Sequence, residues 1–213
     1  MTRMVRRTPN LERCFRYLLA WAPVAAAGTT LQAQRQIPDA VLRSGMLSFL
    51  GHATVGDFVG KTSVVSGAIV GGREYAATRG WVEAPVATLA TGNARRDRDL
   101  RSSMEVERHP VMRFALSGAT IVSIASLGNE DSTTLLLRGT FSIHGVTRRV
   151  ELPATVTRMA DTTRVKAVFP LDLHDYEIGG LTKMFGMLRM EREIEVRVDL
   201  LFVDGPSPLP NDP

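Results

Sequence analysis

The amino-acid sequence predicts an all-β domain made of roughly eight antiparallel strands. Three observations lead to this prediction. Apolar and polar residues alternate with a period of two in short segments from Ser44 onward, glycine-containing turns separate these segments, and the 213 residues are 44% hydrophobic, which suffices for one substantial core. Alternation alone does not decide between a closed barrel and a sandwich of two sheets, because both protect the edges of the strands.

The last alternating segment, residues 191–203, is the clearest of the predicted strands. Its charged side chains fall on one face and are expected to contact water. Its opposite, apolar face consists of Ile194, Val196, Val198, Leu200 and Phe202. The other predicted strands cover residues 46–53, 62–70, 74–86, 111–125, 133–143, 147–158 and 162–173.

Residues 88–110 interrupt the strand pattern. They are polar and highly charged and contain good helix formers, which predicts one short helix in the loop around 91–104. Because residues 94–101 mix both signs of charge, we expect a solvent-facing surface with weak local ion pairs, where a lipid headgroup or an anionic partner has room to dock. Four prolines predict a disordered or extended, proline-rich tail over residues 206–213.

Residues 1–33 have the pattern of a secretory signal peptide. Several arginines precede the uncharged run YLLAWAPVAAA, and the short segment LQA ends just before Gln34. The apolar run is short for a membrane-spanning helix, so a retained anchor is the alternative rather than the expectation. We therefore expect cleavage before Gln34 and a periplasmic or secreted protein.

The formal charge of +4 comes from this N-terminal segment. Its five arginines and single glutamate leave 21 basic and 21 acidic residues in the rest of the chain. Because nucleic-acid binding depends on neutralising phosphates, a neutral domain without a basic patch predicts no nucleic-acid partner.

The residues that could carry catalysis are scattered. The single cysteine, Cys14, lies in the predicted signal, and no GxSxG motif is present. Residues 59–63, VGKTS, lack the glycine spacing of a phosphate loop and are predicted to form a β-turn. We predict no catalytic residue and no metal site. The alternative is a metal-dependent or acid/base enzyme at the barrel mouth, with ligands or catalytic groups drawn from His52, His144, His174, Asp172 and Asp175.

Three ordered segments resemble the YceI-like, polyisoprenoid-binding family. They are TLATGNARRDRDLRSSMEVERHPVMRFAL, LRGTFSIHGVTRRVELPATV and FPLDLHDYEIG. The resemblance covers residues 49–203 and implies an extended, lipocalin-like antiparallel barrel of eight strands over residues 34–205. It further implies an apolar tunnel for a long-chain amphiphilic lipid.

Given such a barrel, alternation assigns apolar side chains to the tunnel, where they are expected to contact the lipid. The ligand-binding residues predicted in this way are Phe49, Met112, Phe114, Leu116, Leu135, Leu137, Phe141, Ile143, Phe169, Val196 and Val198. Alternation also places Val150, Leu152 and Leu200 inside. Packing of the same side chains in a filled core is the structural alternative.

The expected function is that of an exported, non-enzymatic protein that holds a polyisoprenoid or an isoprenoid quinone and needs no other cofactor. A structural, stress-associated interaction protein is a further alternative. A homodimer and transient contact with a membrane are both compatible with the sequence. His144 has the opposite parity from Phe141 and Ile143, so we expect a structural histidine that points away from the tunnel and bonds the turn or a neighbouring strand.

Overall fold

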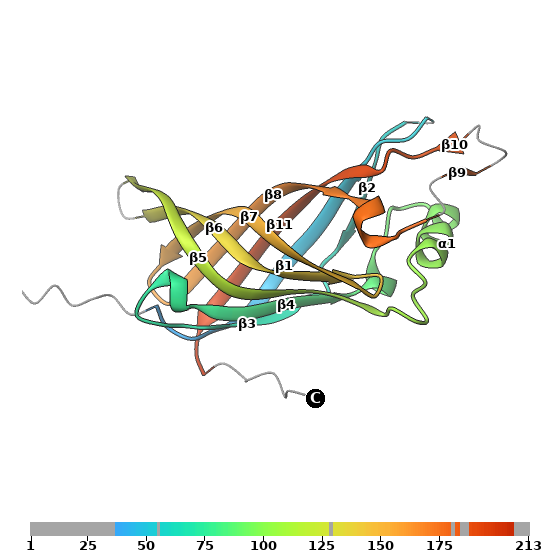
Figure 1. Ribbon diagram of the computed structural model, residues 1–213. Coiled ribbons are helices and arrows are strands. Elements are labelled where there is room, and N and C mark those ends of the chain that lie inside the picture. Colours follow the sequence, from blue (N-terminus) through green and yellow to red (C-terminus); the bar gives the residue numbers. More distant parts are fainter. Residues whose placement is uncertain (1–36, 55, 128–129, 180–181, 184–187, 207–213) are drawn as a thin grey trace, which may run out of the picture. The chain divides into compact units, whose positions relative to one another are not determined.

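The alternating segments form eight antiparallel strands, and these strands close into a barrel (Figure 1). The computed structural model describes residues 37–54, 56–127, 130–179, 182–183 and 188–206. The described residues belong to the compact unit Gln34–Pro213. The barrel strands are β1 (Ala40–Gly51), β2 (Phe58–Thr62) with β3 (Ser66–Val70), β4 (Arg79–Pro85), β5 (Val111–Leu127), β6 (Glu130–Ile143), β7 (Val146–Met159), β8 (Thr162–Asp172) and β11 (Glu193–Asp204).

The barrel closes where the last strand meets the first. β11 pairs with β8 along one edge and with β1 along the other, in a register that runs from Ala40 opposite Asp204 to Leu50 opposite Glu195. β2 and β3 share one position, because both pair with β1 and only β3 continues to β4. The predicted eight-stranded barrel is thereby confirmed, and the sandwich alternative is wrong.

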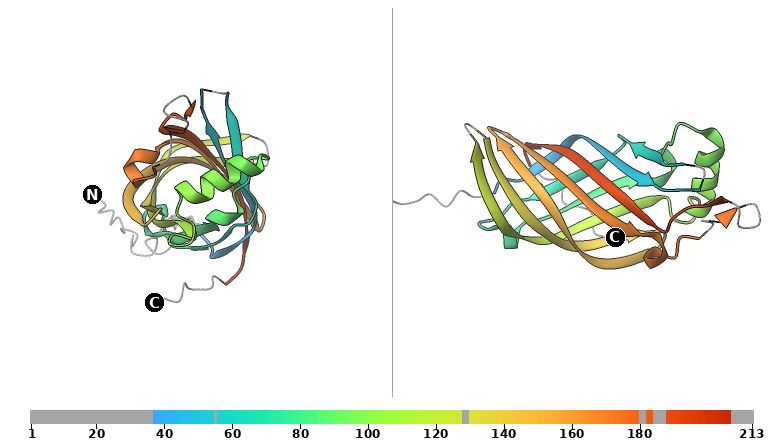
Figure 2. Two further views of the ribbon diagram at one scale, coloured as in Figure 1. Left: turned by 90° about the vertical axis from the view of Figure 1, so that its right-hand side faces the viewer. Right: turned by 90° about the horizontal axis from the view of Figure 1, so that it is seen from above.

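Helix α1 (Ala94–Ser103) lies across one end of the barrel, which we call the α1 end (Figure 2). The side chain of Asn93 begins the helix by accepting hydrogen bonds from the backbone N–H groups of Arg95 and Arg96, at 3.0 and 3.1 Å. The carboxylate of Asp97 accepts bonds from the backbone and the hydroxyl of Thr91. The helix therefore starts at a firmly bonded turn, inside the predicted range 91–104.

Four buried apolar side chains pack together at the α1 end: Met104, Leu173, Tyr176 and Ile178. We call them the end cluster. Met104 follows α1, whereas the other three belong to or follow the short helix η3 (Leu173–Tyr176). The Tyr176 ring also contacts Phe141 edge-on at 5.6 Å between ring centroids. Segments distant in sequence are thus joined at this end by apolar burial.

The opposite end, which we call the far end, carries the β5–β6 and β7–β8 hairpins and the short helix η1 (Tyr75–Ala77) (Figure 1). The remaining elements are η2 (Val86–Thr88) and the small pair β9 (Thr182–Lys183) and β10 (Leu188–Arg189). Within the described residues, every helix is too short or too polar to cross a bilayer.

Some local predictions were wrong. The first strand begins at Ala40 instead of residue 46, and the predicted β-turn at 59–63 lies almost entirely in strand β2. Residues 62–70 are divided into two segments, and the start of 74–86 forms η1 rather than strand. The many glycines in this region lower its intrinsic preference for strand, so sequence reasoning did not identify β2. Pairing with β1 nevertheless stabilises this strand. The predicted signal at 1–33 and nearly all of the predicted tail at 206–213 lie outside the described residues.

Candidate functional site: an apolar tunnel

A cavity of about 730 Å³ runs along the inside of the barrel. Its lining reaches from Phe58 and Leu100 at the α1 end to Tyr75 and Thr163 at the far end. Ligand pockets in proteins typically enclose about 300 to 1,000 Å³, so this volume is that of a binding site rather than a packing defect. The barrel core is therefore hollow along its length.

Alternation along the strands supplies the apolar wall. On β11 the five apolar side chains of the predicted inner face all line the cavity, while Arg197 and Glu193 are exposed on the outside. The wall includes all eleven predicted ligand-binding residues: Phe49, Met112, Phe114, Leu116, Leu135, Leu137, Phe141, Ile143, Phe169, Val196 and Val198. Their position on the wall is thus established, and their contact with a lipid stays a prediction.

Register shifts in β1 and β5 modify the simple alternation of the wall. The register of β5 shifts between Leu116 and Gly118, so the next residue on the wall is Ala119 and not an even-numbered one. A similar shift lies in β1 between Leu42 and Ser44. Val150, by contrast, is half-buried and does not line the cavity, although its neighbour of equal parity, Leu152, does.

Gly139 lies on β6 close to the ring of Phe114, which lines the tunnel. A Cβ atom at this position would lie 2.8 Å from a ring atom of Phe114 and 2.2 Å from the carbonyl oxygen of Ala115. Glycine therefore leaves room for the Phe114 ring at this position.

Helix α1 contributes polar groups that sequence reasoning missed. Its side of the cavity is lined by Arg95, Arg96 and Asp99 and, further along, by Leu100 and Met104. The guanidinium of Arg96 stacks over the Phe58 ring at 4.3 Å. The predicted solvent-facing helix is thus also part of the tunnel, and the spacing of Leu100 and Met104 by four residues was the signal of its inner side.

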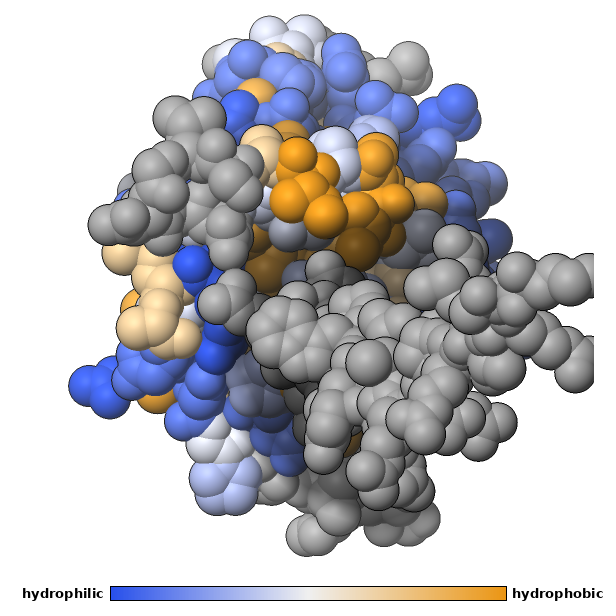
Figure 3. Space-filling model, turned by 90° about the vertical axis from the view of Figure 1, so that its left-hand side faces the viewer, coloured by the Kyte–Doolittle hydropathy of each residue, from blue (hydrophilic) through white to orange (hydrophobic). Residues whose placement is uncertain are grey.

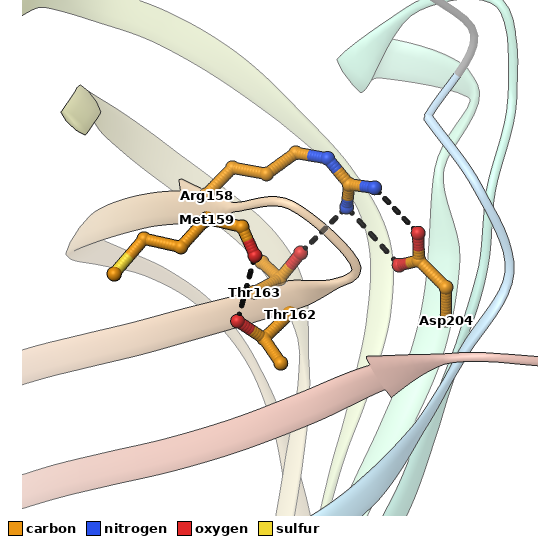
Figure 4. Close-up of polar contacts among 5 residues, drawn as sticks. All are labelled: Arg158, Met159, Thr162, Thr163 and Asp204. Carbon is orange, nitrogen blue, oxygen red and sulfur yellow. Dashed lines mark hydrogen bonds and ion pairs between the residues drawn. The ribbon is translucent and has the colours of Figure 1, made fainter. Parts of the chain in front are cut away.

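The far end has an apolar rim and one inward ion pair. Figure 3 shows hydrophobic side chains gathered beside a hollow at this end, with hydrophilic residues outside them. Arg158 donates hydrogen bonds to both carboxylate oxygens of Asp204 and to the hydroxyl of Thr163 (Figure 4). Hydrogen bonding to Asp204 is the main reason that the pKa of the Arg158 guanidinium is raised. Its charge is consequently satisfied within the protein.

The residues of the enzyme alternative do not form one site. His52 bonds Asp57 at 2.9 Å, which raises the pKa of that imidazole. Asp172 accepts a bond from the backbone of His174. Asp175 lies 3.6 Å from Arg148. In the described part of the chain, the only one of these five groups that belongs to a cluster with metal-binding geometry is His144, and its neighbours there were not among the predicted ones.

His144 occupies the turn between β6 and β7 as expected. His144 and Gly145 both have positive φ, 54° and 77°, which is the backbone of a two-residue hairpin turn. The Nδ1 atom of His144 lies 3.1 Å from the carbonyl oxygen of Tyr176. His144 does not line the cavity, so the prediction that it lies outside the tunnel and bonds a neighbouring element is confirmed, with η3 as that element.

Comparison with known proteins extends these observations. The YceI-like domain model matches residues 41–202 of the chain. A comparison with curated proteins found no match to the chain.

Several solved structures share the fold. A polyisoprenoid binding domain from Saccharophagus degradans, implicated in plant cell wall breakdown, is similar with a TM-score of 0.63 and 14% identity, over 79% of this chain and 99% of that one. BcnA from Burkholderia cenocepacia gives a TM-score of 0.56 and 17% identity, over 74% and 95%. The YceI protein of Campylobacter jejuni gives 0.50 and 17%, over 70% and 85%.

Proposed function

Because the chain belongs to the YceI-like domain family, we propose that it is a non-enzymatic protein that holds a long-chain amphiphilic lipid in its tunnel. The observation that carries the proposal is the apolar wall that continues from one barrel end to the other. The Saccharophagus degradans structure, described as a polyisoprenoid binding domain, has the same fold. A polyisoprenoid or an isoprenoid quinone is the ligand class that combines a long apolar chain with a small polar group.

Energy and length set different limits on such a ligand. Burying one five-carbon isoprene unit contributes about 4 kcal/mol, so about five units already reach the highest affinities known for non-covalent complexes. Longer chains gain no measurable affinity, and tunnel length becomes the selective property. Strands of 12 residues tilted as in other barrels span about 30 Å along the axis, room for about six extended units.

The headgroup belongs at the α1 end. Arg95 and Arg96 line the cavity there and, among the described residues, form no ion pair. At the far end, the guanidinium of Arg158 is already bonded to Asp204. Carbonyl or phosphate oxygens of a headgroup accept hydrogen bonds from arginine, so the polar group lies beneath α1 and the chain points to the apolar rim.

Export is part of the proposal. The signal-like pattern of residues 1–33 supports translocation to the periplasm or the medium, followed by cleavage before Gln34. N-terminal sequencing of the protein secreted by its natural host is expected to begin near Gln34. A chain that retains Met1 or Thr2 would contradict cleavage.

Two adjacent substitutions test lipid storage in the tunnel. Ala167 is buried on the cavity wall, whereas Val168 points outward and is 54% exposed. Ala167→Phe fills the middle of the tunnel and is expected to abolish uptake of a long-chain isoprenoid quinone, because a side chain replaces the lipid. Val168→Phe adds a similar bulk outside and leaves uptake unchanged. Uptake is measured by co-elution of quinone with the folded protein and mass spectrometry.

Equal uptake by both variants would show that the lipid does not occupy the tunnel. Circular dichroism of both proteins confirms that the comparison is made between folded barrels.

A further inference from the structure

Three side chains with metal-binding atoms meet outside the tunnel at the α1 end. They are Glu105 and His109, which follow α1, and His144 in the β6–β7 turn. One ligand atom from each lies within 4.8 Å of the other two. None of the three lines the tunnel, so lipid binding does not account for the cluster.

The Nε2 atom of His144 is available as a metal ligand. A carbonyl oxygen only accepts, so the bond between Nδ1 and Tyr176 places the proton on Nδ1 and leaves a lone pair on Nε2. The side chain is only 10% exposed, and its Nε2 atom is buried with no hydrogen-bond partner among the described residues. Metal-bound histidines commonly have this arrangement, with the second ring nitrogen bonded to a carbonyl.

The other two groups face this nitrogen. Glu105 Oε1 lies 3.9 Å from His144 Nε2, while Oε2 accepts a bond from Arg108 at 2.7 Å. The His109 ring meets the His144 ring edge-on, at 5.1 Å between centroids. Gly145 makes this approach possible, because a Cβ atom there would lie 2.6 Å from His109 Cε1. The turn is therefore shaped around the histidine pair.

The backbone at two of the three positions is strained. Glu105 and His144 have φ values of 44° and 54°, which L residues adopt at a cost. Two hydrogen bonds to the Glu105 carbonyl, from the N–H groups of Arg108 and His109, hold the turn after α1. Local backbone geometry thus brings Glu105 and His109 to the same side as His144.

We propose that Glu105, His109 and His144 bind one divalent transition-metal ion of the zinc class. Two neutral imidazoles and a carboxylate are a donor set that such ions favour. In a tetrahedral site with bonds of about 2.0 to 2.2 Å, ligand atoms lie about 3.3 Å apart. Since the Glu105 side chain is 42% exposed, it can close the remaining distance. Water occupies the fourth coordination position, and the ion links the segment after α1 to the β6–β7 turn.

Cobalt(II) absorption and zinc(II) calorimetry test this site on untagged full-length protein treated with a chelator. The wild type is expected to bind one ion per chain and to show the visible bands of nitrogen-coordinated cobalt. His109→Ala and Glu105→Gln should each weaken binding by at least about tenfold. His174→Ala removes an exposed histidine outside the cluster and leaves binding unchanged.

Because His144 is buried, His144→Ala carries a risk of misfolding. The role of His144 is therefore tested in the wild type, through the NMR signals of its imidazole ring. Zinc is expected to shift the signals of His109 and His144 and not that of His174. Absence of stoichiometric binding, or binding that persists in His109→Ala, would overturn the proposal.

Discussion

The two ends of the barrel differ in their buried apolar packing and in the charged residues near the cavity. At the α1 end, buried apolar residues of the end cluster seal one side, and charged residues of α1 line the cavity beside them. At the far end, hydrophobic side chains border the hollow, and the guanidinium of Arg158 is bonded to Asp204. The difference suits the proposed orientation of the lipid, with the headgroup at the α1 end and the apolar chain toward the far end, and it predicts that burial at the α1 end contributes more to stability.

The largest expected effect is on stability at the α1 end. Tyr176 is 2% exposed, so Tyr176→Ala removes a buried aromatic ring and should lower the free energy of unfolding by about 3 to 5 kcal/mol. At the far end, Met159 is 52% exposed, so Met159→Ala should change the free energy of unfolding by less than about 0.5 kcal/mol. Urea denaturation measures both. Similar losses at the two ends would remove the contrast in stability.

The next effect concerns lipid affinity. Arg96→Ala removes a cation from the cavity lining and should weaken binding of an isoprenoid quinone by about tenfold, the effect of roughly one charge-assisted hydrogen bond. Arg98 lies on the same helix but does not line the cavity, so Arg98→Ala is the matched control. Fluorescence titration provides the dissociation constants. Equal affinities for the two variants would place the headgroup elsewhere.

A smaller effect separates the inner and outer surfaces of the barrel. The Arg158–Asp204 pair is partly buried inside the far end, whereas the Arg164–Asp199 pair is more exposed on the outer surface. Asp204→Asn should cost about 1 to 2 kcal/mol of unfolding free energy, since it leaves a partly buried guanidinium without its counter-charge. Asp199→Asn should cost less than about 1 kcal/mol. Thermal and urea unfolding of both variants measure the two losses of unfolding free energy. Equal losses would show that the partly buried pair contributes no more to stability than the exposed pair.

The smallest effect is a pH dependence at the β1–β2 loop. The hydrogen bond to Asp57 raises the pKa of His52. A raised pKa stabilises the fold fully below the unfolded value of about 6.5, and this contribution is lost as pH rises through the folded pKa. NMR titration should show a His52 pKa above its usual value that returns toward it in Asp57→Asn. An unchanged pKa in the variant would assign the shift to another group.

Sequence reasoning reached most of the tunnel wall because alternation holds along most of each long strand. Phe49, Leu135 and Val196 were placed inside from parity alone, and they line the cavity. Barrel closure came from the family resemblance, since a sandwich has the same alternation.

What sequence reasoning missed depends on contacts between distant segments. Ala119 lies inside because a bulge in β5 shifts the parity, and bulges carry no clear sequence signal. The cluster of Glu105, His109 and His144 forms only when the loop after α1 folds against the β6–β7 turn. No spacing in the sequence brings these three residues together.

The most direct test of lipid storage is mass spectrometry of an organic extract of protein purified from its natural host. We predict about one isoprenoid-type lipid per chain, with a chain length near that of the tunnel. Repeated recovery of an empty barrel that also takes up no isoprenoid lipid when offered it would contradict the account.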